Sequence, residues 1–159
     1  MRPFVRAVLG LAAVLGAAAA GSDASAREYA SLRSDKVYLR EGPTYQHRVL
    51  WVYQRKGWPV EIIDSYEGWR RVRDRDGTTG WVSAAMLSSA RTVVVTAATK
   101  TPISATPRPG AKVIALAEPG VVAGLKACKP HACKVSAGDV DGWIEKNKIW
   151  GVGAGEVFQ

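Results

Sequence analysis

Beyond residue 26 the chain has no sustained helical periodicity, and this limits its possible folds more than any other feature. Short runs rich in Val, Ile, Tyr and Trp alternate instead with Gly, Pro and Asp, which favour turns. Asp76-Gly77, between two such runs, is a strong signal for a tight turn. The pattern predicts an all-β fold, with a short helical turn at residues 83–87. Strands are expected in the first half at residues 36–40, 49–53, 59–65, 69–74 and 79–82.

The second half of the chain repeats this layout in weaker form. Strands are expected there at residues 113–116, 120–126, 132–136 and 142–144, while residues 92–95 either begin the second unit or bridge the two. Residues 57–61 match residues 119–123, and Gly80-Trp81-Val82 matches Gly142-Trp143-Ile144. The repeat predicts two small units of one kind. Because each unit is marginal in size, closure into a barrel and packing between the units should matter to stability.

The first 26 residues have the layout of a secretory signal peptide. Arg2 and Arg6 supply a basic start, residues 7–21 are uncharged, and Ala24-Ser25-Ala26 supplies small residues for cleavage after Ala26. A membrane anchor is the alternative, but a run of about fifteen residues rises only about 22 Å, short of a hydrocarbon core of roughly 30 Å. We therefore expect a periplasmic or secreted protein that does not span the membrane after processing.

Cys128 and Cys133 lie close together in a chain that we expect to be exported. This combination predicts a disulfide, which would span a turn between paired strands. A metal site that includes His131 is the alternative, but three ligands so close together with no fourth nearby make a poor tetrahedral set. No metal or other cofactor is therefore expected.

Four motifs in the first unit resemble the bacterial SH3 domain pattern. They are Val37-Tyr38-Leu39-Arg40-Glu41-Gly42-Pro43-Thr44, Lys56-Gly57, Gly68-Trp69-Arg70-Arg71-Val72 and Gly77-Thr78-Thr79-Gly80-Trp81-Val82. The resemblance covers residues 29–87 closely and residues 100–151 loosely. In the second unit, residues 101–106 replace the usual Leu-Arg…Gly-Pro strand and turn, so we expect that unit to be a structural companion.

The resemblance implies two SH3-like β-barrels in tandem. The expected division is a signal peptide at 1–26, a first barrel at 27–90, a divergent second barrel at 91–151 and a tail at 152–159. The ending, from Ile149 to Val157, is similar to the tail of a Gram-negative tandem version of the family, which implies a periplasmic location. From the alternation along the strands, the core of the first barrel should contain Leu39, Val60, Ile62, Val72 and Val82.

Aromatic and arginine side chains of the first unit are the candidate binding residues. A small barrel cannot enclose so many aromatic rings, so some must lie at the surface. There they could pack on sugars or peptides while guanidinium groups take carboxylates, and peptidoglycan offers both kinds of group. The alternative is that the tryptophans brace the barrel and the arginines pair with Glu61, Asp74 and Asp76. The candidates are Tyr38, Arg40, Tyr45, Trp51, Tyr53, Trp69, Arg71 and Trp81.

No catalytic constellation is visible in the sequence. The chain has two histidines, His47 and His131, and lacks a Gly-x-Ser-x-Gly elbow and a His-Glu-x-x-His motif. Its net charge of +8 would suggest nucleic acid inside a cell, but export points to anionic envelope components instead. The sequence therefore favours a non-catalytic module that binds peptidoglycan or another anionic envelope component. A periplasmic protein–protein adaptor or a structural envelope protein is the alternative.

Overall fold

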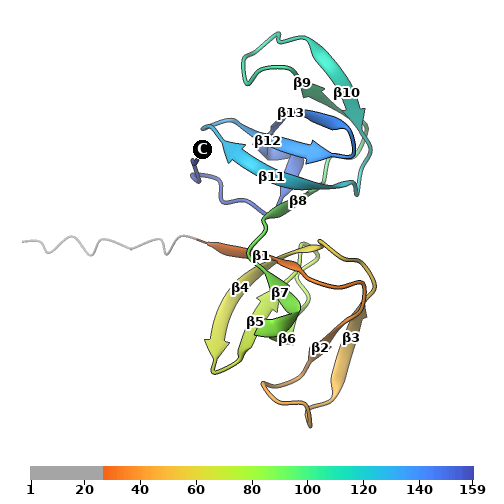
Figure 1. Ribbon diagram of the computed structural model, residues 1–159, viewed down its shortest axis with the longest axis vertical. Coiled ribbons are helices and arrows are strands. Elements are labelled where there is room, and N and C mark those ends of the chain that lie inside the picture. Colours follow the sequence, from red (N-terminus) through yellow and green to blue (C-terminus); the bar gives the residue numbers. More distant parts are fainter. Residues whose placement is uncertain (1–26) are drawn as a thin grey trace, which may run out of the picture.

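The computed structural model describes residues 27–159 as two antiparallel seven-stranded sheets, one above the other in Figure 1. The first sheet has the strand order β3-β2-β6-β5-β4-β1-β7. Its strands are β1 (Glu28–Leu32), β2 (Val37–Arg40), β3 (Val49–Tyr53), β4 (Pro59–Tyr66), β5 (Trp69–Arg73), β6 (Thr79–Ser83) and β7 (Leu87–Ser88), with the 3₁₀ turn η1 (Ala84–Met86) before β7.

The second sheet repeats this topology strand for strand, with the order β10-β9-β13-β12-β11-β8-β14. Its strands are β8 (Thr92–Val95), β9 (Thr101–Ser104), β10 (Val113–Ala117), β11 (Val122–Cys128), β12 (Ala132–Ala137), β13 (Val140–Glu145) and β14 (Ile149–Trp150), with the 3₁₀ turn η2 (Lys146–Lys148) before β14. The all-β, two-barrel prediction is confirmed. The expected signal peptide, residues 1–26, lies outside the described residues. Between residues 27 and 159, no helix has both the length and the apolar character needed to cross a bilayer.

The core of the first barrel forms from the inward positions of its strands. Leu39, Val60, Val72 and Val82 are fully buried, as alternation along the strands predicts, and Ile62 is partly buried against them. Leu32 of β1 adds to this core. The sequence did not predict β1, whose residues become a strand only by pairing with β4 and β7.

A glycine on β6, and its equivalent on β13, lies directly against the second strand of its own barrel. A Cβ at Gly80 would lie 2.6 Å from Cγ of Leu39, and one at Gly142 would lie 2.5 Å from Cγ2 of Ile103. Both glycines therefore allow a close approach that no other residue permits.

The second barrel contains the strand β9, although residues 101–106 lack the usual sequence motif for it. Thr101 and Ile103 of β9 are buried, and Pro102 between them is exposed, the same burial pattern as in β2. Residues 92–95 begin the second sheet as β8, which resolves the alternative left open by the sequence. The repeat alignment of residues 57–61 was wrong by one position, because strand pairing matches Glu61 with Gly124.

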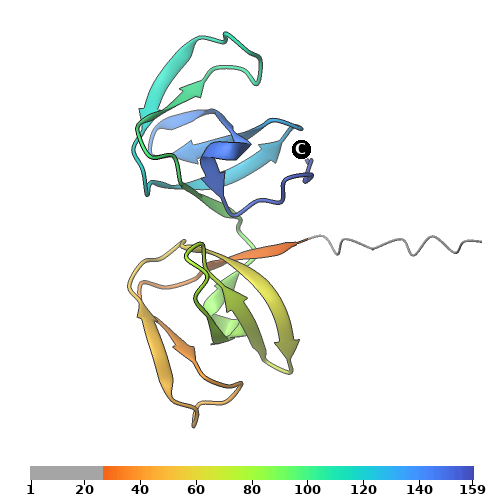
Figure 2. The same ribbon diagram turned by 180° about the vertical axis from the view of Figure 1, so that it is seen from behind.

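The disulfide prediction is confirmed. Cys128 and Cys133 are directly paired between β11 and β12 with their Cα atoms 4.1 Å apart, and both are buried in the second core. The C-terminal tail folds back along this barrel, as Figure 2 shows from behind. Phe158 pairs with Cys128 through two backbone hydrogen bonds, so the tail is part of the second barrel's structure.

The two barrels meet along β1 and β8. The Tyr29 ring packs edge-on against Trp150 with centroids 5.5 Å apart. The Thr92 hydroxyl donates a 2.6 Å hydrogen bond to the Gly57 carbonyl and lies 2.9 Å from the Ser31 hydroxyl. Because the connection between β7 and β8 is short, these contacts fix how the barrels lie relative to each other.

Candidate functional site

One row of outward side chains crosses three strands of the first barrel. Arg40 on β2 pairs with Trp81 on β6, and Trp81 pairs with Arg71 on β5. The neighbouring residues Leu39 and Val72 are buried, so alternation turns the members of this row toward solvent. In the strand register Trp81 therefore lies between Arg40 and Arg71.

Arg40 organises the loop that follows β2. Its Nη1 donates hydrogen bonds to the carbonyl oxygens of Tyr45, at 3.0 Å, and His47, at 2.9 Å. Its guanidinium also lies 5.7 Å from the Tyr38 ring centroid and 5.5 Å from that of Tyr45. Arg40 is therefore a positioning residue for two exposed aromatic rings.

Tyr45 completes this surface by reaching across to β5. Its ring packs edge-on against Trp69 with centroids 5.0 Å apart, and it remains 68% exposed. Trp69 and Trp81 are half-buried, so each both packs on the barrel and presents part of its ring. We call this surface the arginine–aromatic face, formed by Tyr38, Arg40, Tyr45, Trp69, Arg71 and Trp81.

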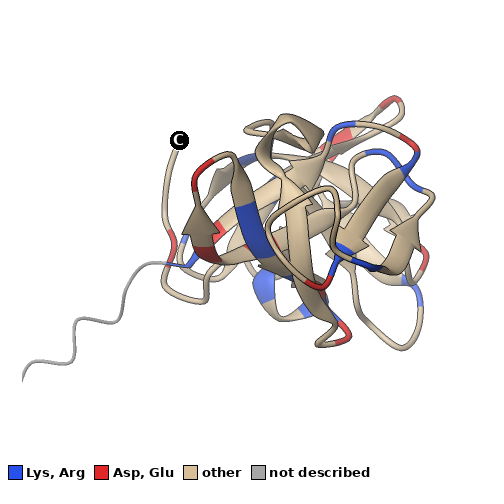
Figure 3. Cartoon of the chain, turned by 90° about the horizontal axis from the view of Figure 1, so that it is seen from below, with Lys and Arg blue, Asp and Glu red and all other residues tan. Residues whose placement is uncertain are grey.

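Arg71 is the exposed cation of this face, opposite Asp64 of β4 in the strand register. Its side chain is exposed, and within residues 27–159 no carboxylate lies within ion-pair distance of it. The arginines beyond it are paired: Arg73 donates to Glu61 at 2.9 Å, and Arg75 to Asp76 at 3.1 Å. Figure 3 shows basic and acidic segments scattered over the same view of the molecule. The alternative of an ion-paired row thus holds for Arg73 and Arg75 and fails for Arg71.

Two candidate residues, Trp51 and Tyr53, lie on the other side of the sheet. On β3 they pair with Leu39 and Val37, whose side chains point inward. Tyr53 is only 7% exposed, and its hydroxyl donates a 3.1 Å hydrogen bond to Oδ2 of Asp74. Burial, and then the Asp74 carboxylate, raise the pKa of Tyr53 far above its ordinary value. The sequence grouped these two residues with the face, and the structure separates them from it.

Trp51 and Tyr53 instead line a groove at the mouth of the first barrel, together with Trp58. One hollow of about 290 Å³ runs from these rings to Asp74, Asp76 and Thr78. A second, of about 570 Å³, shares the same rings and ends at Gln54 and Arg55. We call the set Trp51, Tyr53, Trp58, Asp74 and Asp76 the mouth groove.

Sequence reasoning missed the acidic side of the mouth groove. Its alternative paired Asp74 and Asp76 with arginines; Asp76 does pair with Arg75, whereas Asp74 accepts hydrogen bonds from the backbone N–H groups of Asp76 and Thr78. The turn signal Asp76-Gly77 located the loop. Only the barrel's closure brings the loop beside β3, so no local sequence signal could have found the groove.

The second barrel lacks the arginine–aromatic face. Strand pairing places Ser104, Trp143 and Lys134 where the first barrel has Arg40, Trp81 and Arg71. The position of Trp69 is taken by Ala132, and that of Tyr38 by Pro102. That the second barrel is a structural companion stays a prediction.

A cleft of about 690 Å³ lies where the barrels meet, lined by Tyr29, Trp150 and the tail. Its cations are already engaged. Lys146 Nζ donates to the carbonyl oxygens of Ala154 and Glu156, and Arg27 Nε lies 3.8 Å from Glu61. The cleft is therefore held together by contacts between its own walls.

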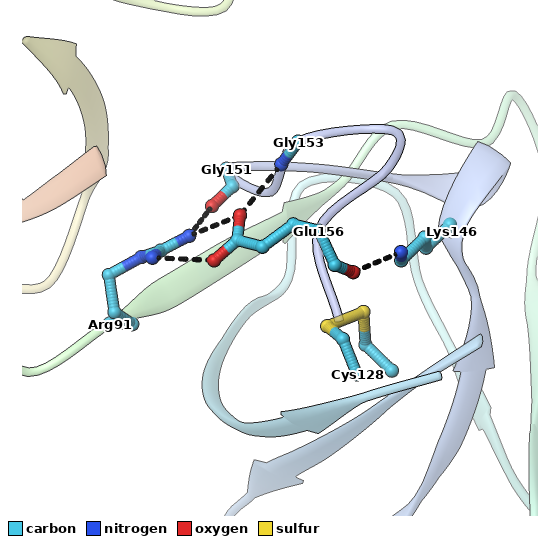
Figure 4. A network of polar contacts seen from close by, with 7 residues as sticks. Arg91, Cys128, Lys146, Gly151, Gly153 and Glu156 are labelled. Atoms are coloured by element: carbon cyan, nitrogen blue, oxygen red, sulfur yellow. Dashed lines mark hydrogen bonds and ion pairs between the residues drawn. A yellow bond between two sulfur atoms is a disulfide. The ribbon is translucent and has the colours of Figure 1, made fainter. Parts of the chain in front are cut away.

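Arg91, at the start of the second barrel, ties the tail to this junction. Figure 4 shows its guanidinium facing Glu156 and the Gly151 carbonyl oxygen, with Nη1 2.9 Å from Oε1 of Glu156. Burial raises the pKa of Glu156, but the hydrogen bonds from Arg91 and from the Gly153 N–H outweigh burial and lower it overall. The carboxylate is thus held charged beside the guanidinium.

The described part of the chain contains no group of three or more His, Cys, Asp and Glu side chains placed to hold a metal ion. His47 and His131 are exposed and lie on different barrels, and both cysteines are joined in the disulfide. The arrangement offers rings, cations and carboxylates suited to binding.

Comparison with known proteins identifies the repeated unit. The bacterial SH3 domain family matches residues 33–89 and again 97–151. No curated protein sequence matches the chain.

Similar solved structures belong to larger proteins. NlpC2 from Trichomonas vaginalis is 14% identical over 78% of this chain and 48% of its own, with a TM-score of 0.36. An NlpC/P60 family protein from Bacillus cereus is 13% identical over 77% of this chain and 56% of its own, with the same TM-score. This chain thus spans about half the length of those proteins. On the two family matches and the two repeated sheets, the chain belongs to the bacterial SH3 domain family, as a tandem of two such domains.

Proposed function

We propose that the protein is an exported, non-catalytic binding module that recognises peptidoglycan through the arginine–aromatic face of its first barrel. The observation that carries this proposal is the exposed Arg71, which has no carboxylate oxygen within 4.0 Å among residues 27–159 and lies beside Trp81 and Trp69. An arginine left unpaired among aromatic rings is suited to an anionic ligand that also has flat or apolar surfaces.

Peptidoglycan matches this chemistry in both of its parts. Sugar rings can pack on the exposed Tyr45 and the half-buried Trp81, and a peptide carboxylate can accept two hydrogen bonds from the Arg71 guanidinium. The signal-like residues 1–26 would deliver the protein to the periplasm or the exterior, where this polymer lies.

A protein–protein adaptor is the second candidate, favoured by the edge strand β10. This strand ends the second sheet and exposes Val113, Ile114 and Leu116, with Leu116 60% exposed. An unpaired edge with large apolar side chains can pair with an extended segment of another protein.

Co-sedimentation with purified insoluble peptidoglycan tests the first proposal. Arg71→Ala should weaken binding about tenfold, because one charge-assisted bidentate contact is lost. Lys134→Ala is the matched control, since Lys134 occupies the equivalent position in the second barrel, and it should bind like the wild type.

A stability control and the Lys134→Ala comparison distinguish specific binding from general electrostatic attraction. The melting temperature of Arg71→Ala should stay near that of the wild type, because the side chain is exposed. If the wild-type protein does not co-sediment, or if Lys134→Ala weakens binding as much as Arg71→Ala, the proposal is wrong.

A further inference from the structure

The mouth groove combines two indole rings with two carboxylates. Trp51, which is 57% exposed, Trp58 and the buried Tyr53 line it. Asp74 and Asp76 close one end. Aromatic faces attract cations, and carboxylates attract them more strongly, so both kinds of group favour the same class of ligand.

Asp74 carries a buried charge with no cation beside it. The residue is 7% exposed. Its carboxylate accepts hydrogen bonds from the Tyr53 hydroxyl and from two backbone N–H groups, and all three donors are neutral. Within residues 27–159 no Lys, Arg or His nitrogen lies within 4.0 Å of it. By contrast, Glu61 pairs with Arg73 and Glu156 pairs with Arg91. A cationic ligand would supply the missing partner.

The fold itself does not require these groups. At the positions of Trp51, Tyr53, Trp58 and Asp74, the second barrel has only Ala or Val: Ala115, Ala117, Val121 and Ala137. Three of these, Ala117, Val121 and Ala137, line an apolar void of only about 10 Å³ at the second core. One barrel of this chain therefore closes with small apolar residues where the other presents rings and a carboxylate.

The chain also provides an example of a cation on one of these rings. The Arg55 guanidinium lies 5.4 Å from the Trp58 ring centroid and donates to the Gly120 carbonyl oxygen of the second barrel. It occupies the end of the groove opposite Asp74 and Asp76. At the acidic end Asp76 keeps an exposed ion pair with Arg75 at 3.1 Å, whereas Asp74 has no cation within 4.0 Å among residues 27–159.

We propose that the mouth groove binds the alkylammonium side chain of a diamino acid in the peptide part of peptidoglycan. The alkyl stem would lie against Trp51 and Trp58, and the ammonium group would donate hydrogen bonds to Asp76 and face the charge of Asp74. This inference rests on the proposed function, because it takes its ligand from the same polymer. A carboxylate would be repelled from this end, and a neutral sugar would leave the Asp74 charge uncompensated.

The groove would bind a cationic group of the ligand, and the arginine–aromatic face would bind an anionic one. They lie on opposite sides of the β2–β3 ribbon, since Trp51 pairs with the inward Leu39 while Tyr38 and Arg40 point outward. The two sites would therefore contact separate points of the polymer. Binding in the groove should depend on amines of the ligand, whereas general attraction to a basic protein depends on its anions.

Acetylation of the peptidoglycan amines tests the inference. Insoluble peptidoglycan is treated with acetic anhydride, which removes the ammonium charge, and binding of the full chain is compared with that to untreated material. Acetylation should weaken wild-type binding about fivefold, the scale of one solvent-exposed cation–π contact. Asp76→Asn and Trp51→Ala should each lose a similar factor on untreated material and lose nothing further on acetylation.

Matched variants guard against general effects. Asp139→Asn changes an acidic turn residue of the second barrel. This variant should bind like the wild type and should respond to acetylation to the same extent. Trp51→Ala should fold, because Ala115 already occupies the equivalent position. Arg71→Ala should bind more weakly yet keep the full response to acetylation.

A small ligand tests binding in the groove independently of the polymer. Nα-acetyl-lysine amide should shift the NMR signals of the Trp51 and Trp58 indole N–H groups, and its Nε-acetylated form should not. If acetylation of the peptidoglycan leaves wild-type binding unchanged, the inference is overturned while the proposed function stands. If the lysine probe nevertheless binds, the occupant is a lysine of a protein partner, which also overturns the inference as stated. Absence of any binding to peptidoglycan overturns both proposals.

Discussion

The Tyr53 hydroxyl donates a 3.1 Å hydrogen bond to Oδ2 of Asp74, joining the edge strand β3 to the loop after β5. This contact holds together the two sides of the mouth groove, which are far apart in the sequence. Because both groups are buried, the contact bears on stability as well as on the shape of the groove.

Tyr53→Phe should lower the free energy of unfolding by about 2 kcal/mol, because it removes one buried hydrogen bond to a charged group and leaves the ring in place. Chemical denaturation measures the change. Tyr66→Phe, at an exposed tyrosine with no hydrogen bond from its hydroxyl among the described residues, should change stability little. Equal losses in both variants would contradict this role for the Tyr53 hydroxyl.

The raised pKa of Tyr53 predicts sensitivity to alkali. The neutral phenol is favoured in the folded state, so its contribution to stability is complete below the unfolded pKa of about 10 and is lost as pH rises above it. Ultraviolet titration should show Tyr53 ionising only as the protein unfolds. Tyr53→Phe should reduce the amplitude of that late phase.

The lowered pKa of Glu156 predicts the opposite dependence on acid. Its carboxylate stabilises the fold above its unfolded pKa of about 4.3, and this contribution is lost as pH falls through the lower folded value. Glu156→Gln should cost about 2 kcal/mol at pH 7 and flatten the stability curve between pH 5 and pH 3, roughly the interval of that titration. Glu118→Gln, in the exposed pair with Lys100, is the control and should have little effect.

Gly80→Ala should destabilise the first barrel by about 2 kcal/mol, because the added Cβ would lie 2.6 Å from Leu39 Cγ and 2.9 Å from the Arg40 carbonyl oxygen. Thermal denaturation measures the loss. Gly68→Ala makes the same chemical change in open space, so it should leave the melting temperature nearly unchanged. A tolerated Gly80→Ala would show that β2 and β6 can separate without cost.

The contacts between the barrels predict that they unfold together. Calorimetry of the wild-type protein should give one transition, because Tyr29, Thr92 and Trp150 join the two cores. Trp150→Ala should lower stability by about 2 kcal/mol and separate the transitions of the two barrels. Trp143→Ala, on the outer row of the second barrel, should destabilise that barrel without separating them. Two well-resolved transitions in the wild type would contradict the prediction.

Much of the fold could be predicted from local pattern. Alternation found Leu39, Val60, Val72 and Val82 in the core because an inward strand position is decided by two-residue periodicity. It did not find β1 or β9. Those segments are strands only because β4 and β10 pair with them, and Thr101-Pro102 has little strand preference of its own.

The candidate site was predictable in composition and less so in arrangement. The sequence identified the aromatic and arginine residues, and strand register brings Arg40, Trp81 and Arg71 into one row. It could not assign Arg40 to loop positioning, nor separate Tyr53 from the face, because both depend on contacts across the barrel.

The sequence by itself determined the all-β class, the tandem repeat, the disulfide and the list of rings and cations from which a site could form. These follow from periodicity, turn residues and spacing, which act over short stretches of chain. Only the tertiary structure decided that, within residues 27–159, neither Arg71 nor the buried Asp74 has an ion-pair partner, and that the second barrel has Ala and Val in place of the groove. Closure of each sheet into a barrel sets which distant side chains meet, and that depends on register around the whole barrel.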